Sequence, residues 1–329
     1  MILVPVISVL VALALDLSFG DPKNKYHPTA WVGALVGRLA PMARSSDPGL
    51  ERAGGMALVA LIALLVGVPM YFAGSTLGNA LGWTGGTAGI IAIAASILAM
   101  GLLLKTTIAI RGMERHAEKI MGAISRGDLE MARASLSMIV KRSTKDLDRS
   151  HVISATLESV SENIVDGITG PMFYFAFFGL SGAFVYRVVN TADSMVGYRT
   201  DLFRNLGWFA ANCDKVLNYV PSRLTSLVMV LACLAVGSDW KASARIMRRD
   251  GPKTESPNAG YPMATMAGAL GVRFEKINHY VLGDGGAEFT DAHFRTAISV
   301  MKVTALLFAG LFTIPVILLM SYLGWWLLA

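Results

Sequence analysis

The sequence predicts an all-α, polytopic membrane protein with about four to six transmembrane or re-entrant helices and cytoplasmic helical loops. Of its 329 residues, 54% are hydrophobic and 16% are charged, whereas soluble domains average about 45–50% and about 25%. The mean hydropathy is +0.53. A soluble core cannot bury that much apolar surface, so lipid must cover part of it. We therefore treat residues 1–329 as a single integral membrane domain.

Four apolar runs approach the length of about 20 residues that a helix needs to cross a bilayer. The first carries Asp16 near its end, and the last ends in Trp325 and Trp326, as is typical of a membrane interface. The linker between the second and third runs has no charged residue, which predicts a hairpin with its tip on the outer side. The four runs are about 2–19, 54–73, 87–104 and 303–328.

Two further segments leave the number of crossings open. Residues 171–189 are rich in phenylalanine and end near Arg187, whereas residues 224–237 are apolar over only 14 positions. Each segment could cross fully, lie tilted, or enter and leave the membrane on one side.

Basic residues indicate the orientation. Ten Lys or Arg residues lie in 105–150, which predicts a cytoplasmic location. The same rule makes 20–52 and 238–302 cytoplasmic. The stretch 190–223 is basic as well, and this conflicts with full crossings on both sides of it. The net charge of +6 is thus explained by topology in a multi-pass inner-membrane protein, and nucleic acid is not an expected partner.

The loops are expected to have structure of their own. We expect a cytoplasmic helical insertion at 105–165, with two helices in its first part and Asp128 as an N-cap. Residues 238–302 form a cytoplasmic loop region punctuated by Gly and Pro. The two cysteines and five scattered histidines indicate neither a disulfide framework nor a zinc site.

One acidic pattern suggests chemistry. In a helix, Glu158, Glu162 and Asp166 recur every four residues and would share one stripe. Like charges so arranged repel one another unless a cation lies nearby, and hard oxygen ligands suit Mg²⁺ together with substrate phosphates. The alternative is a solvated helix face paired with Arg142 or Lys145.

A second polar group follows the phenylalanine-rich segment. Asn190 and Asp193 are three residues apart on one helix face, and Arg187 and Arg199 flank them as candidate phosphate contacts. The alternative is the polar edge of a membrane span. For Asp214 and Asn218, further along the chain, capping or a position at the membrane surface is the default interpretation.

A third polar feature is the turn around Asn258. It could present backbone N–H groups to an anion, or it could be structural.

Several ordered stretches resemble the adenosylcobinamide-phosphate synthase family of cobalamin biosynthesis, the CbiB/CobD proteins. They run through most of the chain, and several are long and unusual. The stretches are Leu15-Asp16-Leu17, Gly20-Asp21-Pro22, His27-Pro28, Glu158-Ser159-Val160, Glu162-Asn163, Asp166-Gly167, Tyr186-Arg187, Asn190 through Tyr198, Asn205 through Trp208, Asp214, Leu217-Asn218, Pro221 through Thr225, and Ser256 through Gly260.

The resemblance implies amide formation between adenosylcobyric acid and aminopropanol or its O-phosphate, with ATP, at a site that faces the cytoplasm. With the carboxylate clusters it implies Mg²⁺ as well. The lipid bilayer is the expected environment, and homo-oligomerisation is left open. We predict catalytic roles for Glu158, Glu162, Asp166 and Asp193. We predict metal binding by Glu162, Asp166 and Asp193. We predict cofactor binding by Asn163, Arg187, Asn190, Arg199, Asp214, Asn218 and Asn258.

Two other classes of protein compete with this interpretation. Asn190, Asp193 and Asp201 faintly resemble the Mg-diphosphate motif of intramembrane prenyltransferases, but a second Asp-rich motif is not convincing. A transporter or sensor is the other alternative. Transporters commonly show repeated halves, and this chain has no internal repeat.

Overall fold

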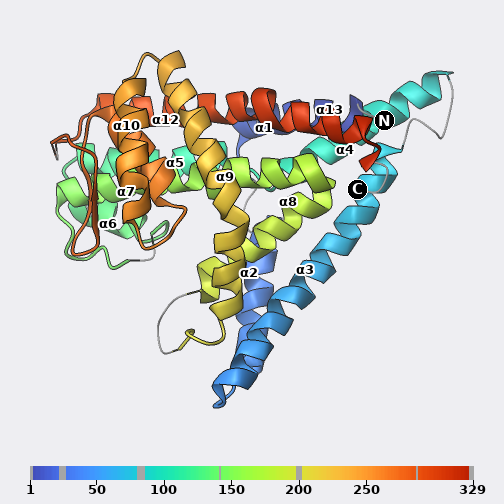
Figure 1. The fold of residues 1–329 in the computed structure, drawn as a ribbon, viewed down its shortest axis with the longest axis horizontal. Helices are drawn as coiled ribbons and strands as arrows, with labels where there is room; N and C mark the ends of the chain where they lie inside the picture. The colour runs from blue at the N-terminus through green and yellow to red at the C-terminus, as the bar shows by residue number, and fades with distance from the viewer. Residues whose placement is uncertain are drawn as a thin grey trace. The chain divides into compact units, whose positions relative to one another are not determined.

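The computed structural model describes residues 3–21, 27–79, 86–140, 142–197, 202–286 and 288–325. It confirms the all-α fold, with one short β-hairpin among the described residues (Figure 1). The helices are α1 Leu3–Phe19, α2 Pro28–Leu39, α3 Pro48–Gly78, α4 Gly86–Lys105, α5 Ile110–Ser125, α6 Leu129–Leu136, α7 Arg149–Ile164, α8 Gly170–Val196, α9 Trp208–Ala235, α10 Trp240–Asp250, α11 Gly260–Leu270, α12 Asp291–Phe308 and α13 Ile314–Tyr322.

Short helical turns and one hairpin complete the described structure. The strands β1 Phe274–Lys276 and β2 Tyr280–Leu282 pair antiparallel, with Lys276 opposite Tyr280. Two turns, Val165–Thr169 before α8 and Ala309–Thr313 before α13, are π-helical. Two more, Ala40–Ala43 and Gly251–Lys253, are 3₁₀-helical.

Five described helical stretches are long and apolar enough to cross a membrane, which supports a multi-pass membrane protein. Large apolar side chains on α3 and α4, such as Leu64 and Ile91, are 63% and 69% exposed. Such surfaces are stable only in contact with lipid or a partner. The stretches are Pro48–Gly78, Gly86–Ser125, Arg149–Val196, Trp208–Ala235 and Asp291–Tyr322.

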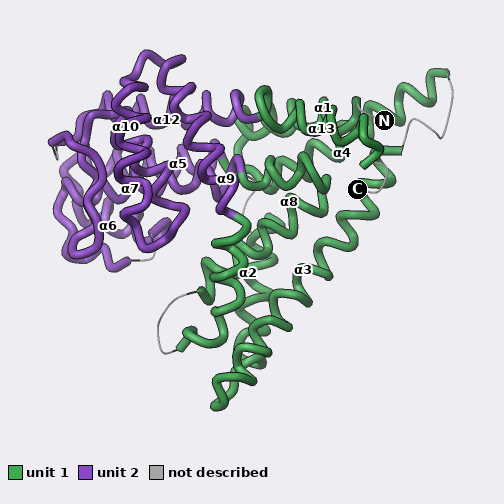
Figure 2. The backbone as a smooth tube through the Cα atoms, in the orientation of Figure 1, with its two compact units in different colours: residues 1–109, 170–217, 309–329 green, residues 110–169, 218–308 purple. Residues whose placement is uncertain are grey.

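The chain forms two compact units, shown in Figure 2. Unit 1 contains residues 1–109, 170–217 and 309–329, and unit 2 contains residues 110–169 and 218–308. In unit 1, α1 packs on α4, and α2 and α3 pack on α8. One apolar cluster, including Val36, Ile62 and Val188, joins α2, α3 and α8.

The phenylalanine-rich segment of unit 1 reverses direction within α8. Gly179 has φ 61° and ψ −151°, a conformation essentially restricted to glycine. The rings of Tyr174 and Tyr186 stack with centroids 5.2 Å apart. A Cβ on Gly170 would lie 2.4 Å from the Tyr186 ring, although these residues would be about 24 Å apart in a continuous helix. Therefore α8 is a hairpin of two helical arms (Figure 1), a geometry that favours the re-entrant alternative for 171–189.

In unit 2, α7 is surrounded by α5, α11, α12 and β1. Its small polar side chains are buried because they bond back to the preceding helical turn. Thr156 Oγ1 donates to the Val152 carbonyl over 2.8 Å, and Ser161 Oγ donates to the Leu157 carbonyl over 2.7 Å. A helix of modest hydropathy can therefore form the centre of this unit.

Aspartate residues cap the N-termini of several helices. Asp128 accepts from Met131 N over 2.9 Å, which confirms the predicted N-cap of α6. Asp148 and Asp239 cap α7 and α10 in the same way. The stretch 238–302 contains more regular structure than a loop region, because α10, α11, the β-hairpin and the start of α12 lie in it.

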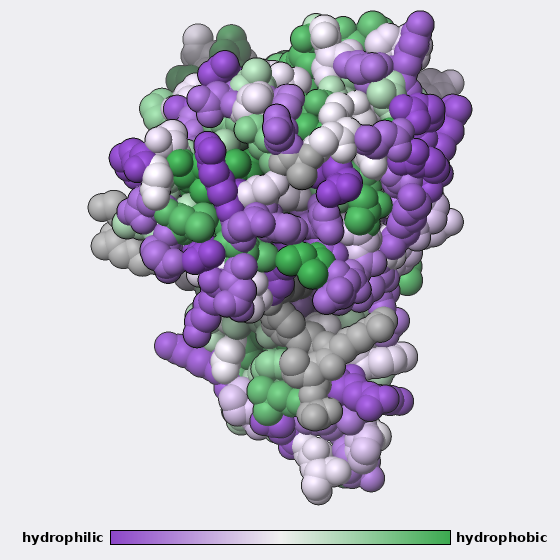
Figure 3. All heavy atoms as spheres, turned by 90° about the vertical axis from the view of Figure 1, so that its left-hand side faces the viewer, coloured by the Kyte–Doolittle hydropathy of each residue, from purple (hydrophilic) through white to green (hydrophobic). Residues whose placement is uncertain are grey.

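Buried ion pairs support both units. In unit 1, Lys105 on α4 lies 3.4 Å from Asp16 and 3.0 Å from Asp21. In unit 2, the fully buried Asp250 accepts from Arg249 over 2.7 and 2.6 Å and from Gly283 N over 2.8 Å. Figure 3 shows a face on which hydrophilic side chains predominate, as expected where a surface contacts water.

Candidate functional site

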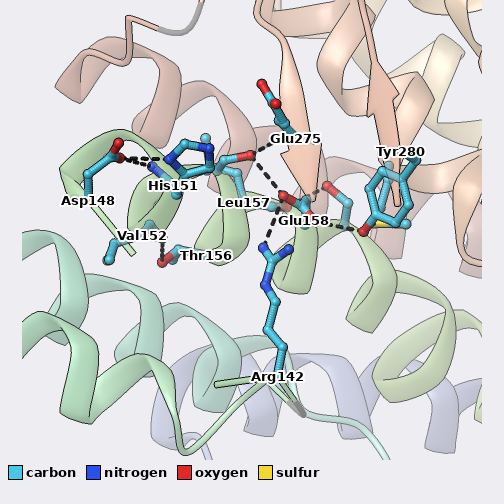
Figure 4. A network of polar contacts seen from close by, with 12 residues as sticks. Arg142, Asp148, His151, Val152, Thr156, Leu157, Glu158, Glu275 and Tyr280 are labelled. Carbon is cyan, nitrogen blue, oxygen red and sulfur yellow. Dashed lines mark hydrogen bonds and ion pairs between the residues drawn. The ribbon is translucent and has the colours of Figure 1, made fainter. Parts of the chain in front are cut away.

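A connected polar group of unit 2 surrounds Glu158 on α7. Its side chain is 7% exposed. Oε1 accepts from Ser154 Oγ over 2.8 Å, and Oε2 accepts from Tyr280 Oη over 2.7 Å. Arg142 Nη2 donates to Oε1 over 3.4 Å. Both oxygens of this buried carboxylate therefore accept hydrogen bonds, and Figure 4 shows the donors converging on it.

The β-hairpin is attached to α7 at this point. Glu275 N, on β1, donates to Ser154 Oγ over 3.0 Å, while Tyr280 of β2 donates to Glu158. Burial raises the pKa of Tyr280 far above its usual value of 10.0, and the charge of Glu158 and the hydrogen bond to it act in the same direction. The Tyr280 hydroxyl thus stays protonated and remains a donor to Glu158 at every ordinary pH.

The predicted acidic stripe is only partly regular. Glu158 is buried and Glu162 is exposed on α7, while the intermediate Asp166 lies in the π-helical turn that follows. The wider π-turn interrupts the four-residue periodicity of the α-helix. Asp166 Oδ1 accepts from Asn218 Nδ2 over 3.2 Å, and Asn163 Nδ2 donates to the Ser159 carbonyl over 2.9 Å. Of these three carboxylates, Glu158 is the one that pairs with Arg142, as the alternative interpretation of the stripe predicts.

The donor chemistry at this end of α7 suits Mg²⁺ in part. Within the described ranges, no three His, Cys, Asp or Glu side chains are grouped closely enough to hold a metal by themselves. Mg²⁺ is commonly held by one or two carboxylates, with phosphate and water completing its shell. Glu162 and Asp166 fit such a partial set, while Glu158 is occupied by protein donors.

The turn around Asn258 is fixed by Arg223 of α9. Arg223 Nη1 donates to Asn258 Oδ1 over 3.0 Å, and Nη2 donates to the Pro257 carbonyl over 3.1 Å. The guanidinium carbon lies 3.7 Å from the centroid of the Tyr219 ring and 4.4 Å from that of Tyr261. These contacts favour the structural interpretation of the turn, and the predicted cofactor role of Asn258 stays a prediction.

Unit 1 contains the second predicted polar group. Arg187 Nη1 donates to Asn190 Oδ1 over 3.3 Å, and Asn190 Nδ2 donates to Asp214 Oδ1 over 3.2 Å. Asp193 lies one turn further along α8 and is partly exposed. A Cβ on Gly197 would lie 2.6 Å from the backbone carbonyl oxygen of Asp193, so a larger residue there would displace the backbone beside this carboxylate. Asp214 lies inside α9 rather than at a helix cap.

Arg199 lies outside the described residues, and its predicted phosphate contact stays a prediction. The structure joins Asp166 with Asn218, and Arg187 with Asn190 and Asp214. No sequence pattern points to Tyr280, which is 122 positions from Glu158. For Arg142, the sequence predicts only a counter-charge to the acidic stripe. Pairing of a distant tyrosine with a buried carboxylate has no local pattern that a single sequence could show.

The fold and these polar groups define a class: a multi-pass helical membrane protein with a polar unit rich in carboxylate and guanidinium groups. A family model described as CobD/Cbib protein matches residues 9–307. The chain therefore belongs to the CobD/Cbib family.

Curated relatives agree with this family. The "Probable cobalamin biosynthesis protein CobD" of Methanothermobacter thermautotrophicus is 38% identical, over 91% of this chain and 94% of its own length. The "Cobalamin biosynthesis protein CobD" of Dehalococcoides mccartyi is 39% identical, over 84% and 85%. The "Probable cobalamin biosynthesis protein CobD" of Methanocaldococcus jannaschii is 33% identical, over 98% of both chains. No solved structure matches the chain.

Proposed function

We propose that this protein forms the amide between adenosylcobyric acid and aminopropanol or its O-phosphate, giving adenosylcobinamide or its phosphate, with ATP and Mg²⁺. Membership of the CobD/Cbib family supports a role in cobalamin biosynthesis. The reaction class rests on the family resemblance of the motifs around Glu158, Asn190 and Asn258. An active site that faces the cytoplasm follows from the cytosolic source of ATP.

The proposed chemistry must activate the acid, because a carboxylate and an amine exchange a proton rather than condense. Transfer of a phosphoryl group from ATP to the carboxylate gives an acyl phosphate and ADP. The free amine then attacks the carbonyl carbon, the C–N bond forms, phosphate leaves, and the nitrogen loses a proton to a nearby base. Bound Mg²⁺ would supply charge neutralisation on the phosphates.

The observation that carries the proposal is the acidic end of α7. Glu162 presents an exposed carboxylate, and Asp166 presents a partly exposed one four residues later. Asn218 holds Asp166 in a fixed orientation through a 3.2 Å hydrogen bond. These two carboxylates are the proposed metal ligands of unit 2, and Glu158 orients the side chains around it.

In unit 1, we assign Asp193 to metal binding and Arg187 with Asn190 to phosphate contacts. Arg187 donates to Asn190, and Asn190 in turn donates to Asp214. A guanidinium anchored by an amide is preorganised to meet an anion, because less side-chain entropy is lost on binding.

The test is a defined reaction. Purified full-length protein is incubated with adenosylcobyric acid, Mg-ATP and either aminopropanol or aminopropanol phosphate, and the product is read by mass spectrometry. We expect a product mass equal to acid plus amine minus water, dependent on ATP and Mg²⁺. Glu162→Ala and Asp193→Ala should abolish it at unchanged protein level. No amide product in the complete mixture, or full activity in both variants, would contradict the proposal.

A further inference from the structure

Arg142 is a partly exposed guanidinium with one polar contact to the described residues. Its side chain is 20% exposed. Its polar contact with the described part of the chain is the 3.4 Å hydrogen bond from Nη2 to Glu158 Oε1, and charge-assisted hydrogen bonds are normally about 2.7–2.9 Å long. A guanidinium carries several further N–H donors. Because the side chain is partly exposed, a bound acceptor can reach these further donors.

Glu158 does not depend on Arg142 for its hydrogen bonds. Ser154 and Tyr280 already donate to its two oxygens over 2.8 and 2.7 Å. In Figure 4 the Arg142 side chain extends from the segment before α7 toward Glu158. The carboxylate therefore aims the guanidinium while leaving most of its donors available.

We infer that Arg142 binds an oxygen of a magnesium-bound phosphate group, as a substrate-binding residue of the proposed reaction. This inference rests on the proposed function for the identity of the ligand. A planar guanidinium can donate to two phosphate oxygens through two parallel N–H groups, a fixed geometry that the ammonium of lysine lacks.

The surrounding charges explain why the phosphate must carry its metal. Glu158, Glu162 and Arg142 all lie close enough to the Tyr280 hydroxyl to act on it electrostatically. Two carboxylates beside one guanidinium repel a bare anion. Mg²⁺ held through Glu162 reverses that balance, and Arg142 then meets a phosphate that the metal also contacts.

Two substrates of the proposed reaction carry this chemistry, namely ATP and aminopropanol phosphate. Binding is measured by titration calorimetry on the full-length protein in nanodiscs, with Mg-ATP, aminopropanol phosphate plus Mg²⁺, and each ligand without the metal. The variants are Arg142→Ala and Arg142→Lys. The matched control is Arg149→Ala, which removes an exposed arginine from the start of α7. Thermal unfolding of each variant reports its folding.

We expect Arg142→Ala to weaken one of the two magnesium-phosphate ligands by about 10- to 100-fold, the loss of one or two charge-assisted hydrogen bonds. Arg142→Lys should lie between alanine and wild type, and Arg149→Ala should match wild type. The weakened ligand identifies the source of the phosphate. If Arg142→Lys melts like wild type and binds both ligands within twofold of it, Arg142 is only the ion-pair partner of Glu158 and the inference is overturned.

The two proposals can fail separately. Loss of phosphate binding in Arg142→Ala without any amide product from the wild type would support this site and refute the reaction. Amide formation with unchanged KM values for both phosphate substrates in Arg142→Ala would support the reaction and refute this site.

Discussion

Replacing Tyr280 by phenylalanine isolates one hydrogen bond of the candidate site. The change keeps the ring and removes the hydroxyl that donates to Glu158 over 2.7 Å. A hydrogen bond to a charged group contributes about 1.5–3 kcal/mol, and Glu158 is only 7% exposed, so water replaces the donor poorly. We expect a loss of about 2 kcal/mol in the free energy of unfolding, equivalent to a melting temperature lower by roughly 4–8 °C.

The stability difference between wild type and Tyr280→Phe should also depend on pH. The pKa of Tyr280 is raised in the folded state by burial and by Glu158, so above about pH 10 the unfolded chain loses this proton first. Stability contributed by the protonated hydroxyl is therefore complete below that pH and declines as the pH rises. The difference in melting temperature between wild type and Tyr280→Phe should shrink in alkaline buffer.

The assay is thermal unfolding in detergent, with Tyr261→Phe as the control. Tyr261 lies in the same unit, and its ring packs on Arg223. Its hydroxyl makes no described hydrogen bond, so this variant should melt within about 1 °C of wild type. Equal melting temperatures for wild type and Tyr280→Phe would refute the reasoning, as would a difference that widens at high pH.

Three more substitutions test buried charges and close packing through thermal unfolding. Lys105→Met leaves the fully buried Asp16 without its 3.4 Å partner and should cost about 3–5 kcal/mol; adding Asp16→Asn should recover part of that loss. Asp250→Asn should cost about 2 kcal/mol at pH 7, because the hydrogen bonds from cationic side chains outweigh burial and hold the pKa of Asp250 far below 3.8. The stability that Asp250 contributes is present above about pH 3.8, the pKa of an unperturbed aspartate, and is lost as the pH falls toward the folded pKa. The stability difference between wild type and Asp250→Asn should therefore shrink in acid. Gly55→Ala would place a Cβ 2.0 Å from a backbone carbonyl and should destabilise by about 1–3 kcal/mol, whereas Gly78→Ala on the same helix meets nothing within 4 Å.

Each of these has a result that would contradict it. For Lys105→Met, a triple variant that also neutralises Asp21 should be more stable than the single one, and a further loss would contradict the ion-pair argument. For Asp250→Asn, a stability loss that becomes larger below pH 4 would contradict the argument from the lowered pKa. Equal melting temperatures for Gly55→Ala and Gly78→Ala would show that α3 can move away from the neighbouring loop.

Long apolar helices could be predicted from the sequence because hydropathy is a local property. The spans 54–73 and 87–104 lie inside α3 and α4. The start of α9 could not be predicted, since Asp214, Asn218 and Arg223 interrupt its hydropathy. Asn218 is stabilised in α9 by Asp166, 52 positions away, and a single sequence does not show such a partner.

The candidate site shows the same division. The four-residue spacing of carboxylates in the sequence predicts a helix at this position, and α7 is a helix. The burial of α7, however, depends on hydroxyl groups that donate to backbone carbonyls of the same helix, as those of Thr156 and Ser161 do. Judged by composition alone, such a helix is classed as polar and exposed. The predicted catalytic, metal-binding and cofactor-binding roles remain predictions that the experiments above address.

The glycine-centred reversal in α8 bears on how many times the chain can cross a bilayer. The arm before Gly179 has nine residues and extends roughly 13 Å, under half of a 30 Å hydrocarbon layer. If that arm enters the bilayer, the chain turns back before the far side, and α8 would add no crossing at its start.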